Sequence, residues 1–543
     1  MKIRTILLLL PLATALLSCA GTESGTDSKV TPPACVSVSP ADGATGIAVS
    51  SASVVFTYDQ NVKVTSANKS LVTVSGDATV SGVNAYGKDV TVSIEGLKYS
   101  TTYTVSIPSG VVQGYKDGQD GADAVSVSFT TAAEPEDPGT DEHLSEDAWE
   151  LASQLGLGWN MGNHFDAFYN GTWAGDLFLY PNETCWGASP ATQTTFDGVA
   201  AAGFTSVRIP VTWLKMIGDA PSYTLYETWL NRVYEVVGFA HNAGLNVIIN
   251  THHDENHHSI IENGVDIDTR WQDVLGASKD DAVNTQIKEE ITAVWTQIAN
   301  KFADCGDWLI FEGFNEINDG GWGYSSAFRA DPTLQCGVLN EWNQTFVDAV
   351  RATGGNNATR WLGAPTYAAN PSFVSYYEVP DDPAGKVMVS VHYYDPSPYT
   401  IGAEQYSDWG HTGASGLKAG YGDEDFVQST FNTLMRNYVN KGIPVYLGEF
   451  GCSMRSKSNT RAWAFFKYYM EYVVKAAHTY GLPAFLWDNG AEGDGQEHHG
   501  YINHGTGGYI GNSKEIIDLM VKATADTSES YTLQSVYDSA PIF

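Results

Sequence analysis

Two glutamates that end apolar segments are the residues of this sequence best suited to catalysis. Glu316 closes the segment FEGFNE, residues 311–316, and Glu449 closes the segment VYLGE, residues 445–449. A carboxyl group at the end of a buried segment costs free energy unless it is paired or takes part in chemistry. Two carboxyl groups that face each other can protonate a leaving oxygen and either attack a carbon or activate water, and this is the chemistry of glycosidic bond cleavage.

Polar side chains end the neighbouring apolar segments as well, and they fit the same chemistry. Arg208 is suited to keep Glu449 ionised through its charge and hydrogen bonds, and His392 to raise the pKa of Glu316 or relay its proton. Trp487 offers a flat face to a pyranose ring. The further candidates are His252, His253, Asn315 and Tyr394, together with Asn163 and His164 as contacts for a distal sugar.

The apolar segments themselves predict an α/β fold, a (β/α)8 TIM barrel. Helical periodicity lies between them, as in residues 229–240, where Trp and Val side chains recur on one face. Eight strands over about 380 residues match a barrel whose reactive residues gather at the carboxyl ends of the strands. A doubly wound sheet is the alternative, and the lack of a GxGxxG or Walker motif weakens it. The predicted strands are residues 157–159, 207–209, 247–249, 308–311, 361–364, 387–391, 445–447 and 484–487.

The chain before the barrel has a different character. Residues 33–132 contain short β-rich runs separated by turn residues, which predicts a small all-β Ig-like sandwich. We interpret it as a spacer, with sugar binding as the alternative. Residues 133–147 hold seven acidic residues, two prolines and no Lys or Arg, so we expect an extended linker. The barrel is then expected over residues 148–526, followed by a C-terminal tail over 527–543.

The N-terminal residues have the features of an export signal. Lys2 and Arg4 precede an apolar stretch too short to span a membrane, and LLSC at residues 16–19 resembles a bacterial lipobox. We expect residues 1–18 to be a lipoprotein signal peptide, Cys19 to be acylated, and residues 19–32 to form a tether. The expected location is the surface of the outer membrane, with the lipid anchor as the only membrane contact. A plain secretory signal is the alternative.

Composition limits the partners. Lys and Arg number 29 and Asp and Glu 63, so the formal net charge is −34. This charge repels phosphate backbones and argues against nucleic acid binding, whereas a neutral polysaccharide is compatible with it. No cofactor is expected, because carboxyl groups supply both acid and nucleophile, and we expect a monomer. The six cysteines include no CxxC pair, which leaves one disulfide open and indicates no zinc site.

A histidine-rich segment, HHDENHH at residues 252–258, raises the alternative of a metal site. The segment follows a strand and lacks the HExxH spacing of a metal-binding helix. We favour sugar contacts by His252 and His253, with the other histidines in a loop, and assign no metal. A metallohydrolase built on this segment would lose its activity to a chelator.

Seven motifs give residues 150–490 a specific resemblance. The sequence resembles glycoside hydrolase family 5, the cellulase family of clan A, on GLGWNMGNHFDA, CWGASPATQTTFDGVAAAGFTSVRIPVTW, NVIINTHHDE, IFEGFNEI, VHYYDP, VYLGEFGC and FLWDNG. Residues 33–132 resemble bacterial Ig-like modules on SPADGATGIAVSS and VSFTT. The resemblance implies a retaining mechanism with Glu449 as the nucleophile and Glu316 as the acid/base. It implies that Asn315 binds the sugar 2-hydroxyl and that Tyr394 positions the nucleophile.

The other site residues of the family fall by motif on Arg208, His252, His392 and Trp487. Two departures stand out. Ile317 follows the Asn-Glu pair where many relatives have proline, and WGASP at residues 186–190 lacks the asparagine of a WGNP-like element. The second departure puts the contacts to outer sugars in doubt.

The HHD and HYYDP motifs favour the branch of the family that includes xyloglucanases, lichenases and cellulases. The expected activity is therefore that of an endo-β-1,4-glucanase on cellulose, xyloglucan or mixed-linkage glucan. A β-mannanase or xylanase of the same family is one alternative. A non-catalytic, glycan-binding surface lipoprotein is another, and the intact Glu316 and Glu449 argue against it.

Overall fold

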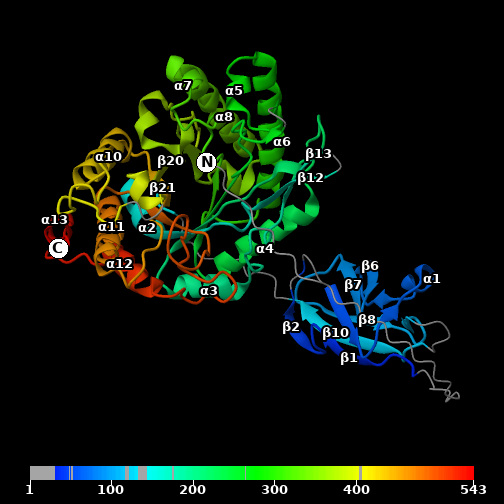
Figure 1. The fold of residues 1–543 in the computed structure, drawn as a ribbon. Coiled ribbons are helices and arrows are strands. Elements are labelled where there is room, and N and C mark those ends of the chain that lie inside the picture. The colour runs from blue at the N-terminus through cyan, green and yellow to red at the C-terminus, as the bar shows by residue number, and fades with distance from the viewer. Residues whose placement is uncertain are drawn as a thin grey trace, which may run out of the picture. The chain divides into compact units, whose positions relative to one another are not determined.

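The computed structural model describes residues 31–47, 49, 53–115, 121–131, 144–173, 176–262, 265–402 and 406–543. The chain divides into two compact units, residues 1–132 and 133–543 (Figure 1). The expected signal peptide, Cys19 and most of the tether and acidic linker lie outside the described residues.

The first unit is a β-sandwich with one hydrophobic core. Its two four-stranded sheets run in the orders β1-β3-β7-β6 and β2-β10-β8-β5. Every second residue of β3 and β8 is buried, because successive side chains of a strand point to opposite faces. The strands are β1 (Cys35–Ser39), β2 (Ala44–Ile47), β3 (Ser53–Tyr58), β5 (Thr73–Val74), β6 (Thr79–Tyr86), β7 (Asp89–Glu95), β8 (Thr102–Ile107) and β10 (Val125–Thr131), with the small pair β4 (Val62–Lys63) and β9 (Gln113–Gly114) and the short helix α1 (Ser66–Lys69) beside them.

The second unit contains a closed barrel of eight parallel strands, as predicted (Figure 1). Nearly every strand residue is buried, which is why these segments are apolar throughout rather than alternating. In order around the barrel the strands are β11 (Leu157–Met161), β14 (Ser206–Ile209), β15 (Asn246–Asn250), β18 (Leu309–Glu312), β19 (Leu362–Pro365), β20 (Val387–Tyr393), β21 (Val445–Phe450) and β22 (Ala484–Asp488).

Helices surround the barrel and bury one apolar face each. On α11 the buried residues include Phe466, Val473, Val474 and Ala477, which recur at helical spacing. The helices are α2 (Ala148–Leu155), α3 (Gln193–Ala201), α4 (Glu227–Asn242), α5 (Val274–Ala277), α6 (Asp281–Lys301), α7 (Ser326–Ala330), α8 (Pro332–Ala352), α9 (Ser397–Thr400), α10 (Glu424–Asn437), α11 (Thr460–Thr479), α12 (Ser513–Ala525) and α13 (Leu533–Asp538). Short 3-10 turns join some of them: η1 (Leu214–Met216), η2 (Gly355–Ala358), η3 (Tyr367–Ala369), η4 (Pro371–Tyr376) and η5 (Val439–Lys441).

The amino end of the barrel is closed by apolar packing. Leu151 and Leu155 of α2 join one buried cluster with strand residues that include Ile248, Met388 and Phe485. The polar side chains lie at the other end, where loops follow the strands. Two hairpins belong to these loops, β12 (Phe168–Trp173) with β13 (Asp176–Pro181), and β16 (Ile261–Glu262) with β17 (Val265–Asp266).

Two further findings concern the described part of the chain. None of its helices is long and apolar enough to cross a membrane. Its five cysteines are all unpaired, so the disulfide that the sequence left open does not form between them.

Candidate active site

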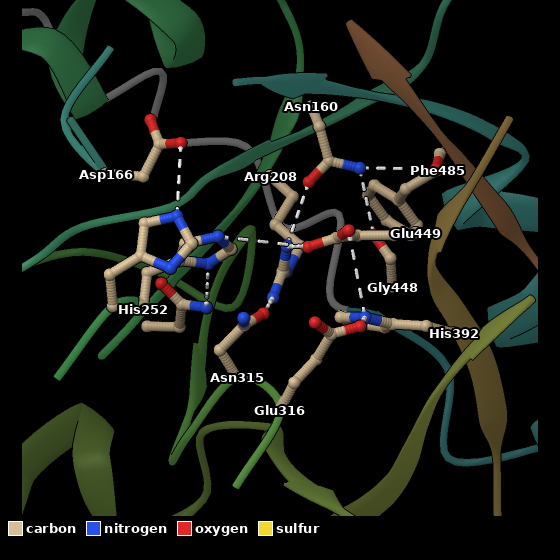
Figure 2. A network of polar contacts seen from close by, with 12 residues as sticks. Asn160, Asp166, Arg208, His252, Asn315, Glu316, His392, Gly448, Glu449 and Phe485 are labelled. Atoms are coloured by element: carbon tan, nitrogen blue, oxygen red, sulfur yellow. Dashed lines mark hydrogen bonds and ion pairs between the residues drawn. The ribbon is translucent and has the colours of Figure 1, made fainter. Parts of the chain in front are cut away.

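Arg208 lies at the centre of the site, fully buried at the end of β14. Its guanidinium donates from Nε to Glu312 at 2.7 Å. One terminal nitrogen donates to Asn160 at 3.0 Å and to Glu449 at 2.9 Å, and the other to Asn315 at 2.9 Å (Figure 2). The planar fork of donors on arginine suits this arrangement, because each nitrogen has a fixed direction. Arg208 therefore joins four barrel strands or their loops into one polar network.

Glu449 lies on β21 at a break in strand register. His392 of β20 pairs with Glu449, and the pairing shifts between Val391 and His392; the pairing of β21 with β22 shifts beyond Leu447. Irregularities of this kind redirect side chains, and they are common next to active sites. The shift turns the Glu449 carboxylate toward the centre of the barrel mouth, where it meets Arg208.

The Glu449 carboxylate has donors on several sides. Besides Arg208, the Tyr394 hydroxyl donates to it at 3.0 Å. Its oxygens lie 3.7 Å from His392 Nδ1 and 4.0 Å from His252 Nε2 (Figure 2). Burial raises the pKa of Glu449 above its usual value, while His392, Arg208 and the Tyr394 hydrogen bond act in the opposite direction. The donors favour the ionised form, which is the form a nucleophile needs.

Glu316 has a different environment. It follows β18 in a loop, keeps 18% of its side chain exposed, and its carboxyl oxygen lies 2.7 Å from His392 Nδ1. Burial and then the negative charge of Glu255 raise the pKa of Glu316 to about 8. Glu316 is therefore mostly protonated at neutral pH and can donate a proton. Figure 2 shows Glu316 and Glu449 facing the same space beside His392.

The two carboxyl groups are close enough to act on one bond. One oxygen of each, together with a ring nitrogen of His392, forms a group whose atoms all lie within 4.8 Å of one another. One carboxyl group is a proton donor, and the other is held by the Arg208 cation and the Tyr394 hydroxyl. This arrangement can protonate one atom of a bond while the other carboxylate attacks its neighbour.

Glu312 is a functional residue that the sequence reasoning missed. Besides Arg208, it accepts hydrogen bonds from Ser390 at 2.6 Å, Tyr446 at 2.7 Å and Asn250 at 3.0 Å. It is fully buried, and Arg208 helps to hold its pKa below the usual value against the opposing effect of burial. A charged residue at the end of the apolar strand LIFE was the available signal.

The walls beside the carboxyl groups are aromatic. The rings of His252 and Trp487 are parallel, with an interplanar angle of 5° and centroids 5.8 Å apart. Gly162 allows this packing, because a Cβ there would lie 2.7 Å from the Trp487 ring. Trp487 is half-buried and is placed beside the reaction centre through His252.

The two candidate sugar contacts after β11, Asn163 and His164, have different positions in the structure. Asn163 lies at the edge of a hollow of about 320 Å³ that the loops after β11 and β22 form with Trp186 and Ala188. His164, by contrast, is fully buried, and its Nε2 lies 2.7 Å from the Ser189 carbonyl. The expectation that His164 contacts sugar is therefore wrong, since the ring serves the packing of this loop.

The histidines of the segment at residues 252–258 also have different partners. His253 lies 3.9 Å from Asp166 and next to Trp186, with ring centroids 5.7 Å apart, so it extends the wall of the site. His257 pairs with Glu255 at 3.7 Å, and His258 with Asp273 at 3.1 Å. His253 and His257 thus both lie beside Glu255, whereas His252 and His258 contact other groups. Donor atoms of Asp166, His252 and His253 come within 4.8 Å of one another, but Asp166 already accepts two backbone N–H bonds.

Comparisons with known proteins agree with this geometry. A family model described as cellulase, glycosyl hydrolase family 5, matches residues 170–493, and a bacterial Ig-like domain model matches residues 29–131. Endoglucanase A of Paenibacillus barcinonensis is 36% identical over 370 residues, which cover 65% of this chain and 84% of that protein. A xyloglucan-specific endo-beta-1,4-glucanase of Bacteroides ovatus is 33% identical over 371 residues, covering 65% and 68%.

A solved structure extends the similarity. A GH5-4 broad specificity endoglucanase from Bacteroides salanitronis is 47% identical with a TM-score of 0.66, and the match covers 72% of this chain and 98% of that one.

Proposed function

The chain belongs to the cellulase family, glycosyl hydrolase family 5, and is a glycosidase of the endoglucanase type; on this premise we propose a retaining double displacement with Glu449 as nucleophile and Glu316 as acid/base. The observation that carries the proposal is the pairing of the two carboxyl groups: one oxygen of each lies within 4.8 Å of the other, and Arg208 and Tyr394 hold Glu449 but not Glu316 by hydrogen bonds. Retention requires carboxyl groups about 5 to 5.5 Å apart, whereas inversion requires roughly 6.5 to 9.5 Å.

The reaction has two steps. In the first, Glu449 attacks the anomeric carbon, the bond to the leaving oxygen breaks, and Glu316 gives that oxygen its proton. In the second, the Glu316 carboxylate takes a proton from water, the water oxygen attacks the anomeric carbon, and the bond to Glu449 breaks. Two inversions restore the β configuration.

The remaining residues orient the sugar and the carboxylates. Arg208 and Tyr394 fix both oxygens of Glu449 by hydrogen bonds. Asn315, held by Arg208 through its carbonyl oxygen, has its amide nitrogen available for the sugar 2-hydroxyl. His392 positions Glu316. We assign sugar contacts to His252, His253 and Trp487 along the aromatic wall, and to Asn163 at its outer end.

The substrate that these features support best is a β-1,4-glucan, and branched xyloglucan in particular. Gly162 packs against the Trp487 ring, and the next residue, Asn163, lines the hollow. The hollow therefore begins next to the Trp487 wall. Its side chains include Ser189, Asn489 and Glu492, which can hydrogen-bond hydroxyl groups. A volume of about 320 Å³ suits a small ligand, such as the sugar of one branch.

Product analysis tests the proposal. The enzyme should release oligosaccharides from the interior of xyloglucan, mixed-linkage glucan or carboxymethyl cellulose, with slower action on mannan and xylan. Proton NMR of the first products should show the β anomer before mutarotation. Early release of the α anomer would overturn the retaining mechanism, and preferred cleavage of mannan or xylan would overturn the substrate assignment.

For the location, we propose a lipid-anchored protein on the outer membrane. The lipobox-like LLSC at residues 16–19 supports it, and the Ig-like unit then acts as a spacer between anchor and barrel. Labelling with radioactive palmitate in a bacterial host should mark the unaltered chain and leave Cys19→Ala unlabelled. Protease treatment of whole cells then tests exposure at the surface.

A further inference from the structure

Another buried carboxylate, Glu255, is connected to the acid/base through short contacts, and the two-step reaction does not use it. Glu255 follows β15 and is 1% exposed, and its backbone is fixed by a bridge to Gln272. One carboxylate oxygen lies 3.6 Å from His253 and 3.7 Å from His257; the other has no hydrogen-bond partner among the described residues. A buried carboxylate with such sparse pairing is costly, which indicates that its charge serves another purpose.

Short contacts connect Glu255 with Glu316. His257 Nε2 lies 3.2 Å from the Asn318 amide nitrogen, and the same nitrogen donates to the backbone carbonyl of Glu316 at 2.8 Å. Two side chains, those of His257 and Asn318, thus connect Glu255 with the backbone of the acid/base. Its charge also acts directly on the Glu316 carboxyl, and after burial it is the largest influence on the pKa of Glu316.

We propose that Glu255 is a positioning residue that keeps Glu316 protonated and in place until the leaving oxygen takes the proton. The inference depends on the proposed role of Glu316 as acid/base. A buried negative charge next to a carboxyl group disfavours a second negative charge, so it holds the proton on Glu316 at pH values where an isolated glutamate has lost it.

The other charges around these residues do not cancel the effect. Glu316 is faced by His392 and Glu449 from β20 and β21, by Arg208 from β14, by Glu312 from β18, and by His253 beside Glu255. His257 and Arg270 also act on Glu255 and favour its ionised form.

The effect of His253 has the opposite sign. Its positive charge lowers the pKa of Glu316, but by less than Glu255 raises it. Glu255 raises the pKa of His253. Removing Glu255 therefore removes the larger effect, which raises the pKa of Glu316. It also makes His253 less often protonated, which weakens the smaller effect that lowers this pKa. The net change favours ionised Glu316.

The test is the pH profile of kcat/KM for Glu255→Gln on mixed-linkage glucan. We expect the alkaline limb to move to lower pH by roughly one unit. Activity should then fall about fivefold near pH 8 and stay close to the unaltered enzyme near pH 5.5. Glu255→Asp, which keeps the charge, should restore most of the limb. Glu235→Gln is the matched control, because it removes another buried carboxylate, on α4 and paired with Arg232, that is not among the charges acting most strongly on Glu316.

A second substrate separates acid catalysis from general damage. With 2,4-dinitrophenyl β-cellobioside the leaving group departs without a proton, so Glu255→Gln should hydrolyse it like the unaltered enzyme near pH 8. If Glu255→Gln does not fold, Glu255→Ser, which leaves room for water beside His253 and His257, carries the same expectation.

The outcomes are distinct. A folded variant whose alkaline limb stays in place, whether activity falls evenly or not at all, overturns the role of Glu255. Failure of the unaltered enzyme to hydrolyse any β-glucan instead overturns the proposed function.

Discussion

Glu312 and Glu449 share one guanidinium: Arg208 donates to Glu312 from Nε at 2.7 Å and to Glu449 from a terminal nitrogen at 2.9 Å. Glu312 lies deeper in the barrel with all its partners fixed, whereas Glu449 faces the cleft. Arg208 therefore has a permanent counter-ion in Glu312, on the side of the barrel interior, and a reactive one in Glu449, on the side of the cleft. When Glu449 forms a bond to sugar and loses its charge, Arg208 remains paired and stays in place.

This relationship predicts that the two glutamates affect stability and activity in opposite proportions. Glu312→Gln should lower the free energy of unfolding by about 3–5 kcal/mol, because it leaves the buried Arg208 without its fixed partner. Glu449→Gln should change that free energy by less than about 1 kcal/mol, since Arg208 keeps Glu312. Urea unfolding followed by fluorescence measures both. Equal stability losses in the two variants would contradict the arrangement.

Substitution of the nucleophile Glu449 should instead have a large effect on activity. Glu449→Ala should reduce kcat by about 10⁴-fold or more, and azide should then produce an α-glycosyl azide from a substrate with an activated leaving group, because azide attacks the open face once. Glu316→Ala should keep activity on that substrate and yield the β-glycosyl azide. NMR of the azide products identifies the anomers. The same anomer from both variants would overturn the assignment.

The barrel could be predicted because its strands are short, mostly apolar segments, and most of them carry a polar residue at or near their carboxyl end. Those ends lie together in every parallel barrel, so Arg208, Asn315, Glu316 and Glu449 could be grouped without coordinates. In the Ig-like unit, β2 and β6 have a weaker sequence signal than the other long strands. Their sequences ATGI and TVSGVNAY contain glycine and small residues that weaken the alternating pattern.

The features that could not be predicted depend on the register of the barrel strands and on how deeply each side chain is buried. Nothing in the sequence indicates that β20 and β21 shift beside His392, yet this shift aims Glu449. Glu312 lies at the end of a strand like the other site residues, but only its contacts show that it serves Arg208 from behind. His164 and His253 both follow strands, and only burial shows that one packs inside the loop.

The pKa of Glu316, about 8 because of burial and the charge of Glu255, predicts a pH dependence. The alkaline limb of kcat/KM should lie near pH 8 on glucans, and the acid limb above pH 4.5, since burial also raises the pKa of Glu449. Initial rates across pH on carboxymethyl cellulose locate both limbs. Loss of activity already near pH 6 on the alkaline side would contradict a protonated Glu316.

The same pKa has a consequence for stability. Because the folded pKa of Glu316 exceeds its unfolded value of 4.5, the folded protein binds the additional proton between these values. Its contribution to stability is complete below pH 4.5 and is lost as pH rises through about 8. Glu316→Gln should therefore flatten the decrease in unfolding free energy between about pH 5 and 8. Urea unfolding at several pH values measures the slope, and an unchanged slope would show that Glu316 is not the group responsible.

The hollow beside Asn163 predicts how branched substrates are recognised. Ala188→Trp places a large ring among the residues that line it, away from both carboxyl groups. If the hollow takes the branch sugar, kcat/KM on xyloglucan should fall by about tenfold or more, which corresponds to roughly 1.4 kcal/mol of lost binding, while carboxymethyl cellulose and mixed-linkage glucan are cleaved as before. Ala282→Trp, on the exposed start of α6, controls for an added surface tryptophan. A parallel loss on branched and unbranched glucans would place the main chain in the hollow, and no loss on either would leave the hollow outside the substrate path.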